Sequence, residues 1–255
     1  MDTLDNYKNE IARALAEAAL DEFNSCEGKL PGTYCPKCKN KGKIRTWVNG
    51  RGVVDVDCEC MKRRENEVRA QDSGLSGRLT KCTFGTFKHQ TEWQHKIYDT
   101  AYKSQYGGNG FFIGGKPGCG KTHICISLVQ SFLSKGVSCR YIAWGELITS
   151  LKQTMYNAAD EYNDTLSALK NAPVLFIDDL FRTEVTNADR AVLFSLIDYR
   201  YNQVESGKNL FTIISSERYL SELSAIDEAI GRRVEEITRG YAVNVPREDK
   251  YKYRG

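Results

Sequence analysis

The chain has 255 residues, of which 41% are hydrophobic and 27% charged, enough for one large or two small cores. A net charge of only +3 excludes a basic field over the whole molecule, so any nucleic-acid surface must be a local patch. No apolar run is long enough to span a bilayer and the acidic start is not a signal peptide, so we expect no membrane association.

Residues 4–23 predict an amphipathic helix, because their apolar side chains recur at helical spacing. This face could pack on its own domain or dock on a partner, and the pattern favours neither. The face consists of Leu4, Tyr7, Ile11, Leu15, Ala18, Ala19 and Phe23.

Two close cysteine pairs follow, a C-x-x-C pair and a C-x-C pair. Their spacing predicts a tetrahedral Zn²⁺ site, closed by four thiolates and therefore structural, in a segment too small for its own core. Free thiols or an iron–sulfur cluster are the alternatives. Basic residues around the pairs, interleaved with Tyr34 and Trp47, fit either a nucleic-acid surface or an ordinary solvated face. The expected ligands are Cys35, Cys38, Cys58 and Cys60.

The stretch "AQDSGLSGR" is polar and rich in glycine and serine, which predicts a linker. We therefore expect an N-terminal helix and zinc domain over residues 1–70, a linker over 71–80 and a second domain over 81–255.

The segment "GGKPGCGKTH" satisfies the pattern G-x-x-x-x-G-K-[ST] and lies between a buried strand and a helix. Glycines and a helix N-terminus turn N–H donors toward an anion. Lys121 would contact the β- and γ-phosphates of a nucleoside triphosphate, and the Thr122 hydroxyl would bind Mg²⁺. Nine cysteines on a chain with such a loop favour a reduced, cytoplasmic setting. The expected nucleotide contacts are Gly115, Lys116, Pro117, Gly118, Cys119, Gly120, Lys121, Thr122 and His123.

Three further buried strands, "SCRYIAW", "APVLFIDDL" and "NLFTIISS", alternate with helical stretches. This order predicts an α/β fold with a parallel sheet flanked by helices. At the end of "VLFIDDL", Asp178 would hold Mg²⁺ through water and Asp179 would polarise the attacking water. A helix N-cap is the structural alternative for these aspartates.

Polar residues follow the strand "LFTIISSE", where a side chain could sense the γ-phosphate. Ser215, Ser216 and Glu217 are the candidates, and Ser216 could instead be a helix N-cap. In "DEAIGRRVEEI", Arg232 or Arg233 could serve as an arginine finger for a neighbouring subunit. The pattern alone favours a salt bridge to Glu235 or Glu236.

The segments "GGKPGCGKTH", "VLFIDDL", "TIISSE" and "DEAIGRRVEE", in this order, resemble the ATPase domain of replicative helicase loaders of the DnaC/DnaI type. These are AAA+ proteins related to the initiator DnaA and to the IstB transposition helpers. The resemblance covers residues 80–245. The preceding cysteine pairs resemble the zinc-binding N-terminal region of Gram-positive and phage loaders.

The resemblance implies that residues 1–70 grip the ring-shaped replicative helicase and that residues 81–255 are an AAA+ ATPase. ATP-bound subunits would associate side by side, engage single-stranded DNA and help to load the helicase. Hydrolysis would be stimulated by DNA or by the partner.

Carried onto this chain, the family's catalytic set comprises Lys121, Asp178, Asp179, the finger Arg233 and a sensor at Ser216. Many relatives have Ser/Thr-Ser-Asn at the sensor strand and serine before the finger. Here Glu217 and Arg232 stand at those positions.

An IstB-like transposition helper is the first rival function. A DNA-binding adaptor that uses ATP only as a switch is the second.

Overall fold

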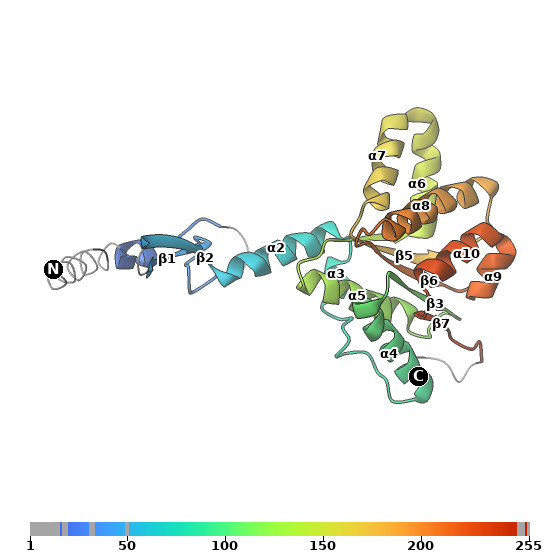
Figure 1. Cartoon of the computed structure of the whole chain (residues 1–255), viewed down its shortest axis with the longest axis horizontal. Coiled ribbons are helices and arrows are strands. Elements are labelled where there is room, and N and C mark those ends of the chain that lie inside the picture. Colours follow the sequence, from blue (N-terminus) through green and yellow to red (C-terminus); the bar gives the residue numbers. More distant parts are fainter. Residues whose placement is uncertain (1–15, 17–19, 31–33, 49–50, 249–252, 254–255) are drawn as a thin grey trace. The chain divides into compact units, whose positions relative to one another are not determined.

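The computed structural model describes residues 16, 20–30, 34–48, 51–248 and 253 (Figure 1). The helix expected over residues 4–23 lies largely outside this range, and residues 20–25 are helical. The chain forms two compact units, Met1–Glu67 and Val68–Gly255. Among the described helices, none has the length and apolarity needed to cross a membrane.

The first unit contains a two-stranded hairpin. Strand β1 (Lys43–Val48) pairs antiparallel with β2 (Gly52–Asp57), and helix α2 (Glu59–Asp72) begins two residues later. The buried apolar cluster of its described part consists of four cysteines, with Ile44 packed against them. So small a core needs a further source of stability, such as a metal ion.

The segment expected to be a linker, residues 71–80, is partly helical. It contains the end of α2 and the short helix α3 (Ser76–Leu79). Leu75 and Leu79 are buried in the core of the second unit. Leucines spaced four apart lie on one face of a helical turn, so this segment packs on the core despite its polar composition.

The second unit is built on a five-stranded parallel sheet in the order β4-β5-β6-β3-β7, which confirms the expected α/β class. Parallel strands need crossover connections, and helices supply them here. The strands are β3 (Gly110–Gly114), β4 (Cys139–Ala143), β5 (Val174–Leu180), β6 (Phe211–Ser216) and β7 (Ala242–Asn244).

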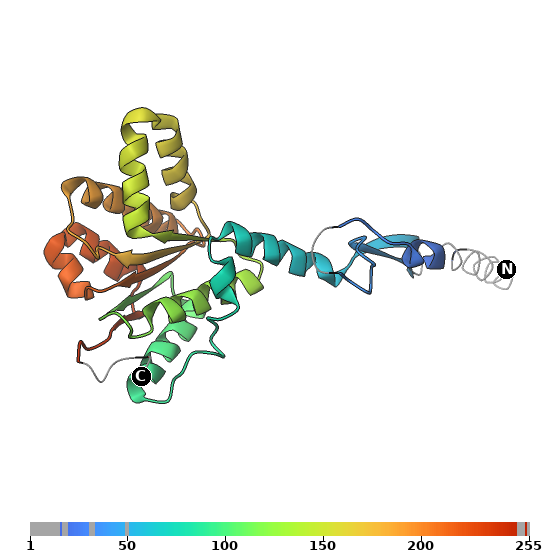
Figure 2. The ribbon, with the colours of Figure 1, turned by 180° about the vertical axis from the view of Figure 1, so that it is seen from behind.

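Helices cover both faces of the sheet (Figures 1 and 2). One face packs against α4 (Glu92–Gly107) and α5 (Lys121–Ser134). The other packs against α6 (Trp144–Asn157), α7 (Ala159–Lys170), α8 (Asn187–Glu205), α9 (Leu220–Ile226) and α10 (Glu228–Ile237). Side chains along β5 alternate between the two cores, as a strand buried on both faces requires.

A buried arginine joins α8 to the sheet. The Arg200 side chain is fully buried, and burial lowers its pKa to about 9. Its guanidinium donates to the Thr212 hydroxyl and to backbone carbonyls near the end of α7 and the start of β6. Carbonyls at a helix C-terminus carry partial negative charge and stabilise the cation without a carboxylate. The carbonyls belong to Leu169, Lys170, Ala172 and Phe211.

Candidate functional site

The phosphate-loop segment lies where the sequence predicted it, between the end of β3 and the start of α5. Gly118 and Gly120 have φ values of 84° and 92°, in the left-handed region that favours glycine. A Cβ on Gly120 would lie 3.1 Å from the ring of Tyr253. The glycine-rich loop therefore leads directly into the N-terminus of α5, whose backbone N–H groups favour phosphate binding.

Lys121, the first residue of α5, holds its ammonium over this loop. The side chain is buried, and Nζ donates to the carbonyls of Gly115 (2.8 Å) and Lys116 (3.1 Å). These acceptors are neutral, and phosphate oxygens would form stronger, charge-assisted bonds with the same group.

Asp178 is the point where the elements of the site converge. Its carboxylate accepts hydrogen bonds from Ser215 on β6 and from the Tyr141 hydroxyl (3.3 Å) on β4. Thr122 Oγ1 on α5 lies 3.5 Å from Asp178 Oδ1. Burial raises the pKa of Asp178, the Ser215 hydroxyl opposes this rise, and the charge of Asp179 adds to it. A hydroxyl and a buried carboxylate this close suit Mg²⁺, whose charge would favour the ionised carboxylate.

Asp179 has an unusual backbone. Its φ is 53°, and the pairing of β5 with β6 shifts register between Ile177 and Leu180. The Asp179 N–H donates to Ser215 Oγ at 3.0 Å, so the same hydroxyl fixes both aspartates. A non-glycine residue in this region is strained and persists only where the surroundings hold it. The two neighbouring carboxylates have different partners, since Asp178 accepts from Ser215 and Tyr141 whereas Asp179 pairs with Arg182.

The two serines expected near the γ-phosphate have different surroundings in the structure. Ser216 is fully buried, its hydroxyl donates to the Leu180 carbonyl (2.7 Å) and accepts from the Arg218 N–H, and it does not contact the aspartates. Helix α9 begins after Tyr219, so Ser216 is not its N-cap either. Ser215 is the serine whose hydroxyl contacts the aspartates, because adjacent residues of a strand point to opposite faces.

A cavity of about 280 Å³ opens over the loop and brings together most of the expected nucleotide contacts. Arg182, which the sequence reasoning missed, lies 3.2 Å from Asp179 Oδ2 and 3.4 Å from Glu217 Oε1. The sequence signal that could have identified Arg182 is its position three residues after Asp179, which places a cation close to that carboxylate. The lining residues are Pro117, Gly118, Gly120, Lys121, Thr122, His123, Asp179, Arg182, Glu217 and Tyr253.

Three expected contacts, Gly115, Lys116 and Cys119, do not line this cavity. The Gly115 carbonyl accepts from Lys121 Nζ instead. Cys119 is buried in the hydrophobic core, and burial raises the pKa of its thiol, so this side chain faces away from the cavity. Lys116 lines an adjoining cavity of about 340 Å³, together with Arg182 and Arg247.

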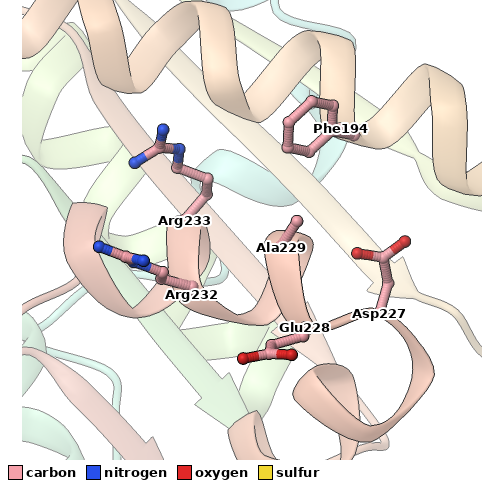
Figure 3. A pocket seen from close by; sticks show the side chains of 6 residues that line it. All are labelled: Phe194, Asp227, Glu228, Ala229, Arg232 and Arg233. Carbon is pink, nitrogen blue, oxygen red and sulfur yellow. The ribbon is translucent and has the colours of Figure 1, made fainter.

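The two arginines of α10 line a different hollow, of about 630 Å³, that shares no lining residue with the phosphate-loop cavity. Figure 3 shows both guanidinium groups on one side of it, with Phe194 and Asp227 on the other. Neither arginine therefore lines the phosphate-loop cavity of its own chain.

Both arginines form ion pairs within the chain. Arg233 lies 2.7 Å from Asp198 and 2.7 Å from Glu236, and its side chain is 27% exposed. The Arg232 side chain is 75% exposed and lies 3.2 Å from Glu236. The salt bridge to Glu236 that the pattern favoured is thus present for both.

The cysteine pairs come together as the spacing predicted. The four Sγ atoms lie within 4.8 Å of one another, with Cys35–Cys58 at 3.8 Å and Cys38–Cys60 at 3.5 Å. A tetrahedron with zinc–sulfur bonds of about 2.3 Å has sulfur–sulfur edges of about 3.8 Å, so this spacing fits the ion.

The chemistry of the cluster also fits a cation. A backbone N–H donor at Cys38 lowers the pKa of Cys35 to about 6, whereas burial raises that of Cys60 to about 12. Four thiolates at this spacing would repel one another, and a bound divalent cation removes that cost. Gly42 follows the first pair with φ of 79°, and a Cβ there would lie 2.7 Å from Met61. Glycine is therefore required where this turn packs on α2.

We expect the wild-type chain to carry about one zinc ion and the variant Cys35→Ser/Cys38→Ser to carry less than about 0.1, because two thiolates cannot complete a tetrahedral site. Metal analysis of purified protein measures this. Cys26→Ser is the matched control, since Cys26 is an exposed cysteine of the same unit. Absence of zinc from the wild type, or its retention in the double variant, would exclude the site.

Comparison with known proteins agrees with this geometry. The family described as "IstB-like ATP binding protein" matches residues 105–227. The uncharacterised protein YqaM of Bacillus subtilis is 30% identical over 240 residues, covering 88% of this chain and 71% of YqaM. The replicative helicase loader DnaC of Escherichia coli is 22% identical over 188 residues, covering 71% of this chain and 76% of that protein.

The fold is shared as well. A crystal structure of the DnaC helicase loader superimposes with a TM-score of 0.54 at 23% identity, covering 66% of this chain and 99% of that one. The expected AAA+ phosphate-loop fold is thereby confirmed. The chain belongs to the IstB- and DnaC-like family of AAA+ ATP-binding proteins.

Proposed function

We propose that this protein is an ATP-dependent loader of the replicative DNA helicase, acting in the cytoplasm on single-stranded DNA. The observation that carries the ATPase part is the convergence on Asp178 of Thr122, Ser215 and Tyr141, beside the phosphate loop. The loader part is supported by similarity to a protein named as a replicative helicase loader.

In this proposal Lys121 binds the β- and γ-phosphates, while Thr122 and Asp178 hold Mg²⁺. Asp179 borders the cavity and would polarise the attacking water. Ser215 takes the role expected of Ser216, because it positions both aspartates. Arg182 holds Asp179 and Glu217 in place until the nucleotide arrives.

We assign the arginine finger to Arg233, as the family resemblance implies, acting on the nucleotide of a neighbouring subunit. Arg233 and the phosphate-loop cavity belong to separate surfaces of the chain, which supports action between subunits. Arg233 forms ion pairs with Asp198 and Glu236. When subunits associate, these ion pairs must break, or the guanidinium must contact the nucleotide while it keeps one of them. Arg232 is the more exposed and is the alternative finger.

The cysteine-rich unit is the proposed grip on the helicase, with Zn²⁺ as its structural ion. The four sulfurs replace the hydrophobic core that this unit lacks. This unit favours the loader over the transposition helper, because its cysteine pairs resemble the zinc-binding region of Gram-positive and phage loaders.

We expect Lys121→Ala to lower ATP turnover by at least about 100-fold, because the variant loses the charge that stabilises the transferring phosphate. Steady-state hydrolysis with and without single-stranded DNA measures this, and DNA should stimulate only the wild type. Lys135→Ala, an exposed lysine at the other end of α5, is the control. Normal turnover in Lys121→Ala would refute the phosphate-loop assignment. ATP binding without turnover under every condition would leave the adaptor function instead.

Arg233→Ala should lower turnover at least about 100-fold without weakening ATP binding, since a finger acts on the transition state. Mixing Arg233→Ala with Lys121→Ala should restore part of the activity, because one variant supplies the arginine and the other the intact loop. Arg232→Ala and the exposed Arg239→Ala serve as comparisons. Restoration by Arg232→Ala mixtures alone would assign the finger to Arg232.

Native mass spectrometry of the full chain mixed with the replicative helicase should give a defined complex whose stability depends on ATP. Cys35→Ser/Cys38→Ser should lose the complex and keep its ATPase activity, because the cysteines lie outside the ATPase unit. Lys121→Ala should keep zinc and lose the ATP dependence. A wild-type chain that forms no complex, with or without ATP, would end the loader proposal.

A further inference from the structure

Tyr253 lies in the phosphate-loop cavity, far along the chain from the loop itself. It is one of the lining residues, and only 9% of its surface is exposed. Its N–H donates to the Gly118 carbonyl at 2.8 Å. The ring lies against Gly120, where a Cβ would come within 3.1 Å of it. Tyr253 is therefore fixed to the two glycines that shape the loop.

An aromatic slot holds the Tyr253 ring. Phe87 stacks on it with a centroid distance of 4.8 Å and an interplanar angle of 24°. His123 closes the slot edge-on, 5.5 Å from Tyr253 and 5.3 Å from Phe87. Phe87 precedes α4, and His123 directly follows the Lys121-Thr122 pair in α5. The slot thus adjoins the position expected for the phosphates.

The slot also offers a hydrogen bond to a planar ring. The Lys88 N–H donates to the Tyr253 hydroxyl at 2.6 Å. A purine presents the same two features, a flat aromatic face and ring nitrogens in its plane that accept from an N–H. Stacking on an aromatic side chain is favourable for any base.

The Tyr253 ring and a base cannot share the slot. Tyr253 also lines the cavity over the phosphate loop. A base stacked on the same face of Phe87 would need the place that the Tyr253 ring holds.

From these contacts we propose that the slot formed by Phe87, His123 and the Lys88 N–H takes the base of the bound nucleotide, and that Tyr253 is an internal competitor for it. This inference rests on the proposed nucleotide binding. A nucleoside triphosphate must displace the Tyr253 ring, whereas a ligand with phosphates alone does not. If the ring occupies the slot nine-tenths of the time, the apparent Kd for ATP is about tenfold above its intrinsic value.

Calorimetric titration with Mg²⁺-ATP and with inorganic tripolyphosphate, which has no base, tests the proposal. Tyr253→Ala should bind ATP about tenfold more tightly than the wild type and tripolyphosphate within about twofold. Tyr253→Phe, which keeps the stacking and loses the bond to Lys88, should fall between them. Tyr106→Ala, a 67% exposed tyrosine of α4, should match the wild type for both ligands.

A second readout uses the wild-type chain. Hydrogen exchange of the Tyr253 amide should become faster with ATP and stay unchanged with tripolyphosphate. Only the base displaces the Tyr253 ring, and displacement of this residue frees the backbone N–H that donates to the Gly118 carbonyl.

If Tyr253→Ala binds ATP no more tightly than the wild type does, and tripolyphosphate binding is intact, Tyr253 does not compete with the base. ATP binding by the chain would still be established. Slower exchange of the Tyr253 amide with ATP would also contradict the proposal, because it would show that Tyr253 holds the base in place and does not compete with it. Failure of the proposed function looks different, because ATP would then bind neither the wild type nor any Tyr253 variant.

Discussion

Parallel pairing of β3, β5 and β6 is the constraint on which the nucleotide site depends. Strands that run in the same direction end at the same edge, so the loop after β3, the aspartates of β5 and the serine of β6 meet there although about 100 residues separate the first from the last. The hydrophobic effect holds this edge together, because apolar side chains of β5 enter cores on both faces of the sheet. Any shift of register in β6 would move Ser215 away from Asp178 and leave that buried carboxylate without its closest donor.

Two polar residues at this edge of the sheet have unfavourable local environments, and the packing of the sheet holds them in place. Asp178 is largely buried and would be easier to protonate there than in water. Asp179 has a left-handed backbone, and the Ser215 hydroxyl accepts its N–H. Both features favour a state in which a divalent cation and an anion complete the site. The site is thus preorganised for charge stabilisation, the usual largest contribution to phosphoryl-transfer catalysis.

The two units rely on different sources of stability. The second unit has extensive cores and a buried arginine that satisfies carbonyls at the junction of α7, α8 and β6. The first unit has a hairpin and four sulfurs, so metal coordination and folding should be one event there. The proposed zinc site and the proposed ATPase site lie in different units, so we expect that substitutions can alter partner binding and ATP turnover separately.

The sequence by itself determined the α/β class, the phosphate loop, the aspartates after β5 and the cysteine tetrad, because each depends on a short pattern with a direct geometric meaning. Tertiary structure decided which of two adjacent serines faces the site, since strand register and not composition sets that choice. It also decided that Leu75 and Leu79 anchor the expected linker and that Arg233 is held by Asp198. The position of Tyr253 could not be predicted from the sequence. Its contacts with Lys88 and Gly118 join segments more than 130 residues apart, and no local pattern connects such segments.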